Sequence, residues 1–420
     1  MNMDDILKRM TEGELWAGYD EVQCAIAEEM AAIAGDPKRL CQSAAGRLDD
    51  IAASAHKEMP RAGARLTGWR VIHTDACILA ALADTDALAS IARLDKAIII
   101  SGAAGYGRLD LILDLIDALQ RRCKHSEPLP ALDLPRTAHP RPSRPPTASS
   151  AVRELADPPL MSVFQRQLSD QPFVLRGYAT DWPCCAEHPW ASAAYLRSAT
   201  GPGRLVPVEI GQDYRAEEWT QELMSWDTFL SHLDFVDQPR KAHSGSVLYM
   251  AQHDLLMQFP TLKSDLLIPD YVYACVGSDE YKPPANDDGL VLNAWLGPAG
   301  TMSPAHTDPF HNFYAQVVGR KTVWLAPPSA SPSMYAYADS QHPASAQKSD
   351  PAPSMSNTSR VDVFADDESE SRAQFPDFWD HVVGSALSVT LDAGDVLFFP
   401  PGWWHAMRSE DTSFSVSMWF

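Results

Sequence analysis

The sequence predicts an α+β protein, with an N-terminal helical domain at residues 1–124 and a double-sheet β domain at 151–420. Three observations support this division. Apolar residues recur at helical spacing in the first part, prolines gather at 125–150, and short strand-like runs separated by Gly, Pro and Asp fill the remainder. A chain of 420 residues is also longer than one hydrophobic core usually serves.

Helical periodicity is clearest at 109–122, where Leu and Ile recur at i, i+3 and i+4 and two arginines end the segment. Residues 14–33 and 48–56 have the same character. We therefore expect a small bundle or a helical-repeat array, although no sequence repeat is evident. This domain is also a candidate for binding a protein partner.

The glycine-rich segment at 97–107 allows two interpretations. An apolar run, a glycine loop and a helix are the order found in phosphate-binding turns. The segment matches neither the dinucleotide fingerprint nor the P-loop, however, because it has no Gly-Lys-Ser/Thr. A helix that ends in a glycine turn is the favoured interpretation.

Residues 125–150 contain seven prolines together with Ser, Thr and Arg. Such a composition predicts an extended, stiff linker rather than a packed element. A proline-rich docking motif is the alternative, and a spacer is the default interpretation.

The β domain is indicated by many short runs with turn residues between them. They lie at 172–176, 205–210, 247–251, 290–295, 312–318, 322–325, 386–391, 396–399 and 413–420. This pattern of short strands and turns predicts a jelly-roll or cupin-like double-stranded β-helix, whose mouth can hold a metal. Residues 328–372, which are Ser/Pro/Ala-rich and then acidic, are predicted to be a flexible surface insertion.

Composition excludes some classes of function. The net charge of −21 argues against direct nucleic-acid binding, and suits a basic partner or simple solubility. The N-terminus lacks the apolar core of a signal peptide, and no apolar run approaches the roughly 20 residues of a membrane span. Seven scattered cysteines without Cys-x-x-Cys are typical of a reducing compartment. We expect a nuclear and/or cytoplasmic protein that is not secreted, in which the sequon at Asn357 has no meaning.

A candidate metal site is formed by His306-Thr-Asp308 and the distant His405. Two imidazoles and one carboxylate are the facial triad of non-haem Fe(II) oxygenases. The tripeptide also occurs at His73-Thr-Asp75, within an alanine- and leucine-rich helical pattern. Positions i and i+2 share a face on a strand but not on a helix, so only the second copy is predicted to bind metal. His311 is a third nearby histidine, disfavoured as a ligand by its opposite strand parity relative to His306.

The residues around this triad resemble those of the JmjC-domain 2-oxoglutarate oxygenases. The similar segments are Trp295-Leu-Gly-Pro, Ser303 to Asp308, Asn312-Phe, Gln316 to Lys321, Ala393 to Pro400 and Trp404-His405. The resemblance covers roughly 152–420 and is closer to the JmjC-only subgroup known as arginyl hydroxylases, earlier described as a lysine demethylase. The long 328–372 segment lengthens the ligand spacing beyond what that subgroup leads us to expect.

The resemblance implies a set of site residues and cofactors. His306, Asp308 and His405 would bind Fe(II), and O₂ and 2-oxoglutarate would be cosubstrates. Lys321 would pair with the distal carboxylate of 2-oxoglutarate, helped by Tyr249, Ser303 and Asn312. A buried cation is also what a dianionic cosubstrate needs on physical grounds. The substrate pocket would consist of Glu209, Trp219, Trp295 and Trp419.

The predicted activity is hydroxylation of arginine side chains in a basic protein or peptide, because a carboxylate with aromatic walls suits a guanidinium. The alternative within the same chemistry is N-methyl-lysine demethylation, as of a histone. The alternative of another class is a non-catalytic interaction scaffold. An intact triad together with Lys321 counts against the scaffold.

Overall fold

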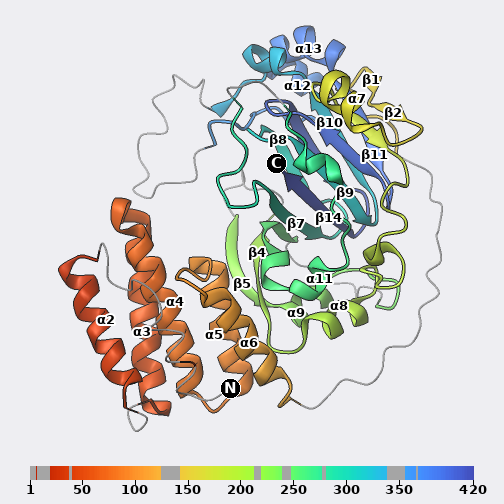
Figure 1. Cartoon of the computed structure of the whole chain (residues 1–420). Helices are drawn as coiled ribbons and strands as arrows, with labels where there is room; N and C mark the ends of the chain where they lie inside the picture. The colour runs from red at the N-terminus through yellow and green to blue at the C-terminus, as the bar shows by residue number, and fades with distance from the viewer. Residues whose placement is uncertain are drawn as a thin grey trace. The chain divides into compact units, whose positions relative to one another are not determined.

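The computed structural model describes residues 6, 19–36, 40–123, 142–211, 219–238, 247–276, 281–337, 355–365 and 368–420. The chain divides into two compact units (Figure 1). The first contains residues 1–130, 196–207 and 223–230, and the second contains 131–195, 208–222 and 231–420. The predicted α+β class is confirmed, since a helical region precedes a β-rich region of two sheets that are mostly antiparallel.

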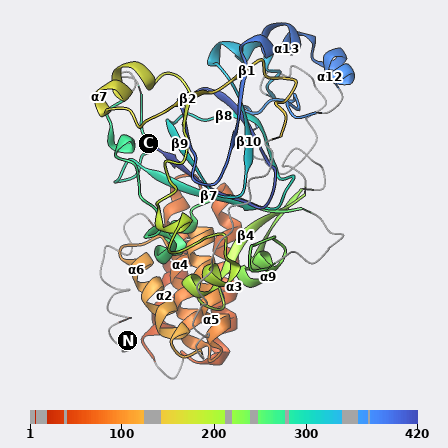
Figure 2. The same ribbon diagram turned by 90° about the vertical axis from the view of Figure 1, so that its right-hand side faces the viewer.

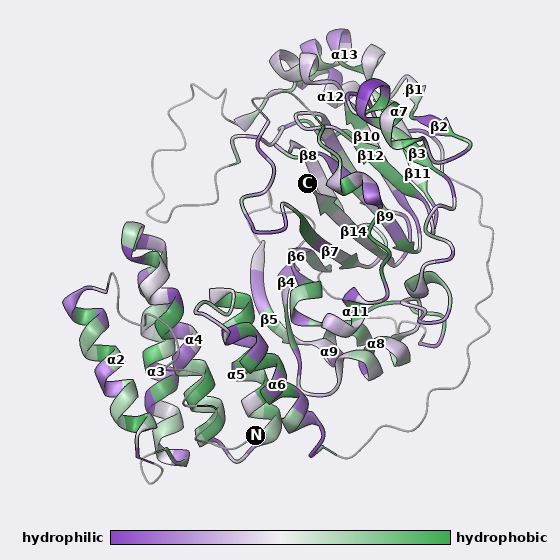
Figure 3. Cartoon of the chain, viewed as in Figure 1, coloured by the Kyte–Doolittle hydropathy of each residue, from purple (hydrophilic) through white to green (hydrophobic). Residues whose placement is uncertain are grey.

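The first unit is built from consecutive helices: α2 (Glu21–Ala34), α3 (Gln42–Glu58), α4 (Leu66–Ala83), α5 (Ala87–Ser101) and α6 (Arg108–Gln120). Figure 3 shows apolar and polar residues alternating along α2 and α3, as expected of amphipathic helices. Helix α5 ends at Gly102, which adopts the left-handed conformation at φ 63°. The glycine segment is therefore a helix C-terminus, as the sequence favoured.

The stretch 196–207 belongs to the first unit, which the sequence did not indicate. Arg204 donates from Nη2 to a carboxylate oxygen of Asp95 at 2.7 Å, and the Leu205 N–H donates to the other oxygen at 2.7 Å. Both charged side chains are buried. This ion pair joins the segment to α5. The predicted linker falls largely outside the described residues, so the boundaries at 124 and 150 stay a prediction.

The second unit contains two sheets, seen side-on in Figure 2. The five-stranded sheet has the order β1-β11-β10-β13-β8, and the nine-stranded sheet has the order β2-β3-β12-β9-β14-β7-β6-β4-β5. Their bounds are β1 Ser150–Ala151, β2 Arg153–Leu155, β3 Phe173–Leu175, β4 Leu205–Ile210, β5 Thr220–Ser225, β6 Leu248–His253, β7 Val291–Gly297, β8 Met302–Thr307, β9 Asn312–Val318, β10 Lys321–Ala326, β11 Leu387–Leu391, β12 Val396–Phe399, β13 Trp404–Ser409 and β14 Ser413–Trp419.

The core of this unit lies between the sheets. Strands of both contribute Val174, Tyr314, Leu325, Leu397 and Met407 to one buried cluster. Short helices occupy connections of this unit: α7 Met161–Val163, α10 Leu255–Gln258, α11 Pro260–Lys263, α12 Glu368–Gln374 and α13 Pro376–His381. Two further helices, α8 Ala193–Thr200 and α9 Trp226–Ser231, lie mostly in the segments that belong to the first unit. No helix of the described residues has the length and apolar character needed to cross a membrane.

The segment 328–372 differs from the predicted flexible insertion at both of its ends. Residues 328–333 form a 3₁₀ helix, and Val361, Val363 and Phe364 are buried in a cluster with Trp324. Because the low-complexity composition of 340–354 dominates the sequence pattern, these packed ends were not distinguished from it. Residues 338–354 and 366–367 of the prediction lie outside the described residues.

Candidate metal centre and cosubstrate pocket

The three predicted metal ligands come together on two neighbouring strands. His306 lies in β8, Asp308 follows the end of that strand, and His405 lies in β13 directly opposite His306 in the antiparallel register. The two imidazole centroids are 4.2 Å apart, and one ligand atom from each residue lies within 4.8 Å of the others. Pro304 is accommodated within β8 because β8 is an edge strand of its sheet.

Backbone carbonyls determine which nitrogen of each imidazole is available. His306 Nδ1 is 2.8 Å from the carbonyl oxygen of Pro304, and His405 Nδ1 is 3.0 Å from that of Trp403. A carbonyl can only accept, so both Nδ1 atoms donate and both Nε2 atoms keep a free lone pair. The Nε2 atoms lie 4.0 Å and 3.5 Å from the two oxygens of Asp308. All three donors therefore face one point, as a bound metal requires.

Electrostatics favour metal-binding protonation states. Burial lowers the pKa of His306 to about 4, with the charge of His405 acting in the same direction. Burial alone would raise the pKa of Asp308, but the hydrogen bond from His405 and the charges of His405 and His306, when these imidazoles are protonated, outweigh this and lower it. A neutral imidazole and an ionised carboxylate are the forms that bind a divalent cation. The donor set thus fits Fe(II), although the same ligands would also accept other first-row metals.

A small cavity opens next to the triad. Besides the three ligands, its walls are Trp295, Ser303, Asn312, Tyr314, Met407, Ser417 and Trp419. The Oδ1 atom of Asn312 accepts the Met418 N–H at 3.2 Å, so its Nδ2 remains to donate. The Trp419 indole N–H is buried and has no hydrogen-bond partner among the described residues. The cavity thus combines aromatic walls with unused donors.

Lys321, at the start of β10, is a buried cation behind this cavity. Its exposed fraction is 1%, and Nζ donates to the Tyr314 hydroxyl at 2.9 Å. The ring of Tyr249 lies 5.7 Å from Nζ, and the Tyr249 hydroxyl shares a hydrogen bond with Ser303. The described residues give Lys321 no carboxylate partner, and burial lowers its pKa to about 7. A buried ammonium without a counter-ion is suited to receive an anionic ligand.

Tyr314 connects Lys321 to an oriented chain of hydrogen bonds and was not singled out by the sequence. Gln316 donates from Nε2 to the Val318 carbonyl at 2.6 Å, which leaves Oε1 as an acceptor for the Ser415 hydroxyl at 2.8 Å. Ser415 is also hydrogen-bonded to Tyr314. Because the Ser415 proton is used on Gln316, Tyr314 donates to Ser415 and accepts from Lys321. Strand alternation from Asn312 to Tyr314 is the signal that could have revealed it.

The predicted substrate residues fall into two pairs. The indole N–H of Trp219 donates to Glu209 at 3.2 Å, and Glu209 lies opposite Tyr249 in the pairing of β4 with β6. Trp295 contacts Tyr249 with ring centroids 6.3 Å apart, and Trp419 lies across the cavity wall. Burial raises the pKa of the half-buried Glu209 carboxyl. Trp295 and Trp419 therefore line the cavity itself, while Glu209 and Trp219 lie beyond Tyr249.

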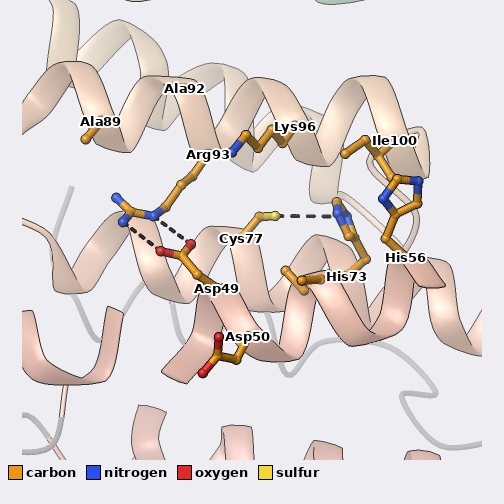
Figure 4. Close-up of a pocket in the computed structure, with 12 residues that line it drawn as sticks. Asp49, Asp50, His56, His73, Cys77, Ala89, Ala92, Arg93, Lys96 and Ile100 are labelled. Carbon is orange, nitrogen blue, oxygen red and sulfur yellow. Dashed lines mark hydrogen bonds and ion pairs between the residues drawn. The ribbon is translucent and has the colours of Figure 1, made fainter. Parts of the chain in front are cut away.

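The other histidines have different surroundings. His73 lies in α4, where its Nδ1 is 2.9 Å from the Ser101 hydroxyl, and Asp75 forms a buried ion pair with Arg108. The helical pattern predicted around this tripeptide is confirmed, and His73 is buried within the helix. Residues of α3, α4 and α5 line a hollow of about 610 Å³. Figure 4 shows His73 and Cys77 among these residues. His311 is buried against Tyr281 and Phe398.

Comparison with known proteins agrees with the site geometry. A family model described as a cupin-like domain matches residues 163–420, which include all three triad residues. The chain is 35% identical over 342 residues to the Jumonji C domain-containing protein 5 of Drosophila melanogaster, covering 80% of this chain and 74% of that protein. The chain belongs to the cupin-like JmjC-domain family.

Other JmjC relatives carry more specific names. The lysine-specific demethylase 8 of Danio rerio is 39% identical over 251 residues, covering 60% of this chain and 53% of that protein. The lysine-specific demethylase JMJ30 of Arabidopsis thaliana is 35% identical over 254 residues, covering 60% of this chain and 50% of that protein. The match thus spans about half the length of these two relatives.

Proposed function

We propose that the protein is an Fe(II)- and 2-oxoglutarate-dependent dioxygenase that oxidises a basic side chain of a protein substrate. The observation that carries this proposal is the convergence of two Nε2 atoms and one carboxylate beside a cavity backed by a buried, unneutralised lysine. Iron with 2-oxoglutarate supplies the oxidant that cleaves a substrate C–H bond. Membership of the JmjC family supports the same chemistry.

In this proposal, His306, Asp308 and His405 hold the metal on one face. Lys321 receives the distal carboxylate of 2-oxoglutarate, while Tyr249, Ser303 and Asn312 donate around it. Trp295 and Trp419 exclude water from the reacting side chain and hold its apolar part. The protein thus contributes geometry and sequestration rather than the oxidant itself.

Two substrates remain as candidates, each favoured by a different observation. The names of the relatives favour an N-methyl-lysine, whose methyl group would be oxidised and lost as formaldehyde. The Glu209 carboxylate beside Trp219 favours an arginine, because carboxylates and aromatic faces both bind guanidinium groups. The overall negative charge suits either basic substrate.

A peptide library containing arginine and methyl-lysine separates the candidates through product masses. Arginine hydroxylation adds one oxygen, whereas demethylation removes one methylene and releases formaldehyde. Glu209→Gln should impair the arginine reaction more than the demethylation. His306→Ala should abolish substrate-dependent succinate formation in both cases, and activity that survives this change would contradict the proposal.

A non-catalytic scaffold is the rival of another class. Anaerobic Fe(II) with 2-oxoglutarate gives a weak visible charge-transfer band in a competent site, and the scaffold should give none. The nuclear and/or cytoplasmic location and a protein partner for the helical unit stay predictions.

A further inference from the structure

Residues 357–359 run beside β8, the strand that carries His306. Thr307 donates its N–H to the Asn357 carbonyl at 3.1 Å, and Ser359 donates its N–H to the Ala305 carbonyl at 2.8 Å. His306 and Thr358 form a β-bridge between these bonds. Since β8 is the outermost strand of its sheet, residues 357–359 cover an edge that would otherwise be free.

The Asn357 side chain adds a second bond to the same residue of β8. Its Nδ2 donates to the Thr307 carbonyl at 2.8 Å, so both backbone polar groups of Thr307 bond to Asn357. Thr307 is the residue between the ligands His306 and Asp308. The opposite side of β8 faces β13, which carries His405. The ligand-bearing tripeptide is thus held from both edges.

We propose that Asn357 is a positioning residue for the metal centre, and that its carboxamide sets the relative placement of His306 and Asp308 by clamping Thr307. The inference rests on the proposed metal centre. Partners outside the ligand shell lower the cost of ordering the ligands, and their loss typically weakens metal affinity about 10- to 100-fold. Asn357 is exposed, so burial does not account for its carboxamide. The nitrogen of its sequon, which a glycan would need, is the atom that donates to Thr307.

The test measures metal binding directly, without 2-oxoglutarate or substrate. Asn357→Leu keeps the side-chain shape and the backbone bond to Thr307 but removes the carboxamide. Mn(II) is titrated into the metal-free full chain, and the Kd is followed by calorimetry. The matched control is Asn286→Leu, because Asn286 is also exposed and clamps Leu290 through both its Nδ2 at 2.7 Å and its Oδ1 at 3.1 Å, in a loop without metal ligands.

We expect the Mn(II) Kd of Asn357→Leu to rise about tenfold, with the Kd of Asn286→Leu unchanged. The Tm of the metal-free protein should change equally in both variants. A Kd within about twofold of the unsubstituted protein overturns the inference. The inference is also overturned if Asn286→Leu raises the Mn(II) Kd by the same factor. It is overturned as well if the Tm of metal-free Asn357→Leu falls further than that of metal-free Asn286→Leu, because either result indicates general destabilisation. If the protein binds Mn(II) tightly but oxidises no peptide, the proposed function is contradicted, whereas the inference about Asn357 is not.

Discussion

Lys321 donates a hydrogen bond from Nζ to the hydroxyl of Tyr314 at 2.9 Å, and both side chains are 1% exposed. Tyr314 is in turn bonded to Ser415, whose own proton is used on Gln316. This chain holds the ammonium in one place before any ligand arrives. Preorganisation of this kind lowers the cost of binding, because the lysine need not be ordered by the ligand.

Tyr314→Phe should therefore weaken binding of 2-oxoglutarate without unfolding the protein. A hydrogen bond to a charged group contributes about 1.5–3 kcal/mol, which corresponds to a loss of at least about tenfold in affinity. Calorimetric titration of the Mn(II)-loaded protein measures the Kd. Turnover at saturating 2-oxoglutarate should change little, so that the KM rises more than kcat falls.

The control for this prediction is Tyr271→Phe. Tyr271 is also buried, and its hydroxyl donates to the Pro159 carbonyl, outside the cavity lining. Its loss should lower the Tm but leave the Kd for 2-oxoglutarate unchanged. Equal effects of the two substitutions on the Kd would show that Tyr314 acts only through stability.

Lys321→Met should abolish 2-oxoglutarate binding and stabilise the ligand-free protein at neutral pH. Burial lowers the lysine pKa from 10.5 to about 7, so the folded state disfavours the ammonium. The resulting cost is complete below about pH 7, shrinks as the pH rises towards 10.5, and is absent above it. Denaturant unfolding of the ligand-free variant at pH 6.5 should show a gain on the order of a few kcal/mol, decreasing by pH 9. A loss of stability at pH 6.5 would contradict the placement of Lys321.

The same pKa predicts how 2-oxoglutarate affinity depends on pH. Nζ lies against the Tyr314 hydroxyl and the ring of Tyr249, and burial raises the pKa of both tyrosines, so both remain neutral through this range. The Kd should be constant below about pH 7 and rise above it, as the unliganded lysine loses its proton. At pH 8 binding should take up a proton, which calorimetry in buffers of different ionisation enthalpy detects. If 2-oxoglutarate binds at pH 8 without proton uptake, Lys321 does not have the lowered pKa on which this prediction rests.

Sequence pattern predicted those strands whose alternation or apolar runs are uninterrupted, including β9, β12 and β14. It did not predict β8 and β13, although these carry the two histidines predicted to bind the metal. Pro304 interrupts the strand-like pattern of β8, and the turn residues directly before Trp404 obscure where β13 begins in the sequence. The pairing of His306 with His405 is a matter of non-local register, which spacing along the chain cannot specify. The predicted ligands could be proposed from their side-chain chemistry, whereas Tyr314 and Asn357 became candidates only through their contacts.

The Asp95–Arg204 ion pair should be important for the stability of the first unit. Removing one partner of a buried pair typically costs about 3–5 kcal/mol, because the remaining charge is left without compensation. We therefore expect Asp95→Ala to lower the free energy of unfolding by about this amount, measured in denaturant. The double substitution Asp95→Leu/Arg204→Met removes both charges and should recover most of the loss. Asp49→Ala is the exposed comparison: Arg93 keeps its second partner, Asp84, so the change should cost less than about 1 kcal/mol. If Asp95→Ala costs no more than Asp49→Ala, the segment 196–207 is not held to α5 by this pair.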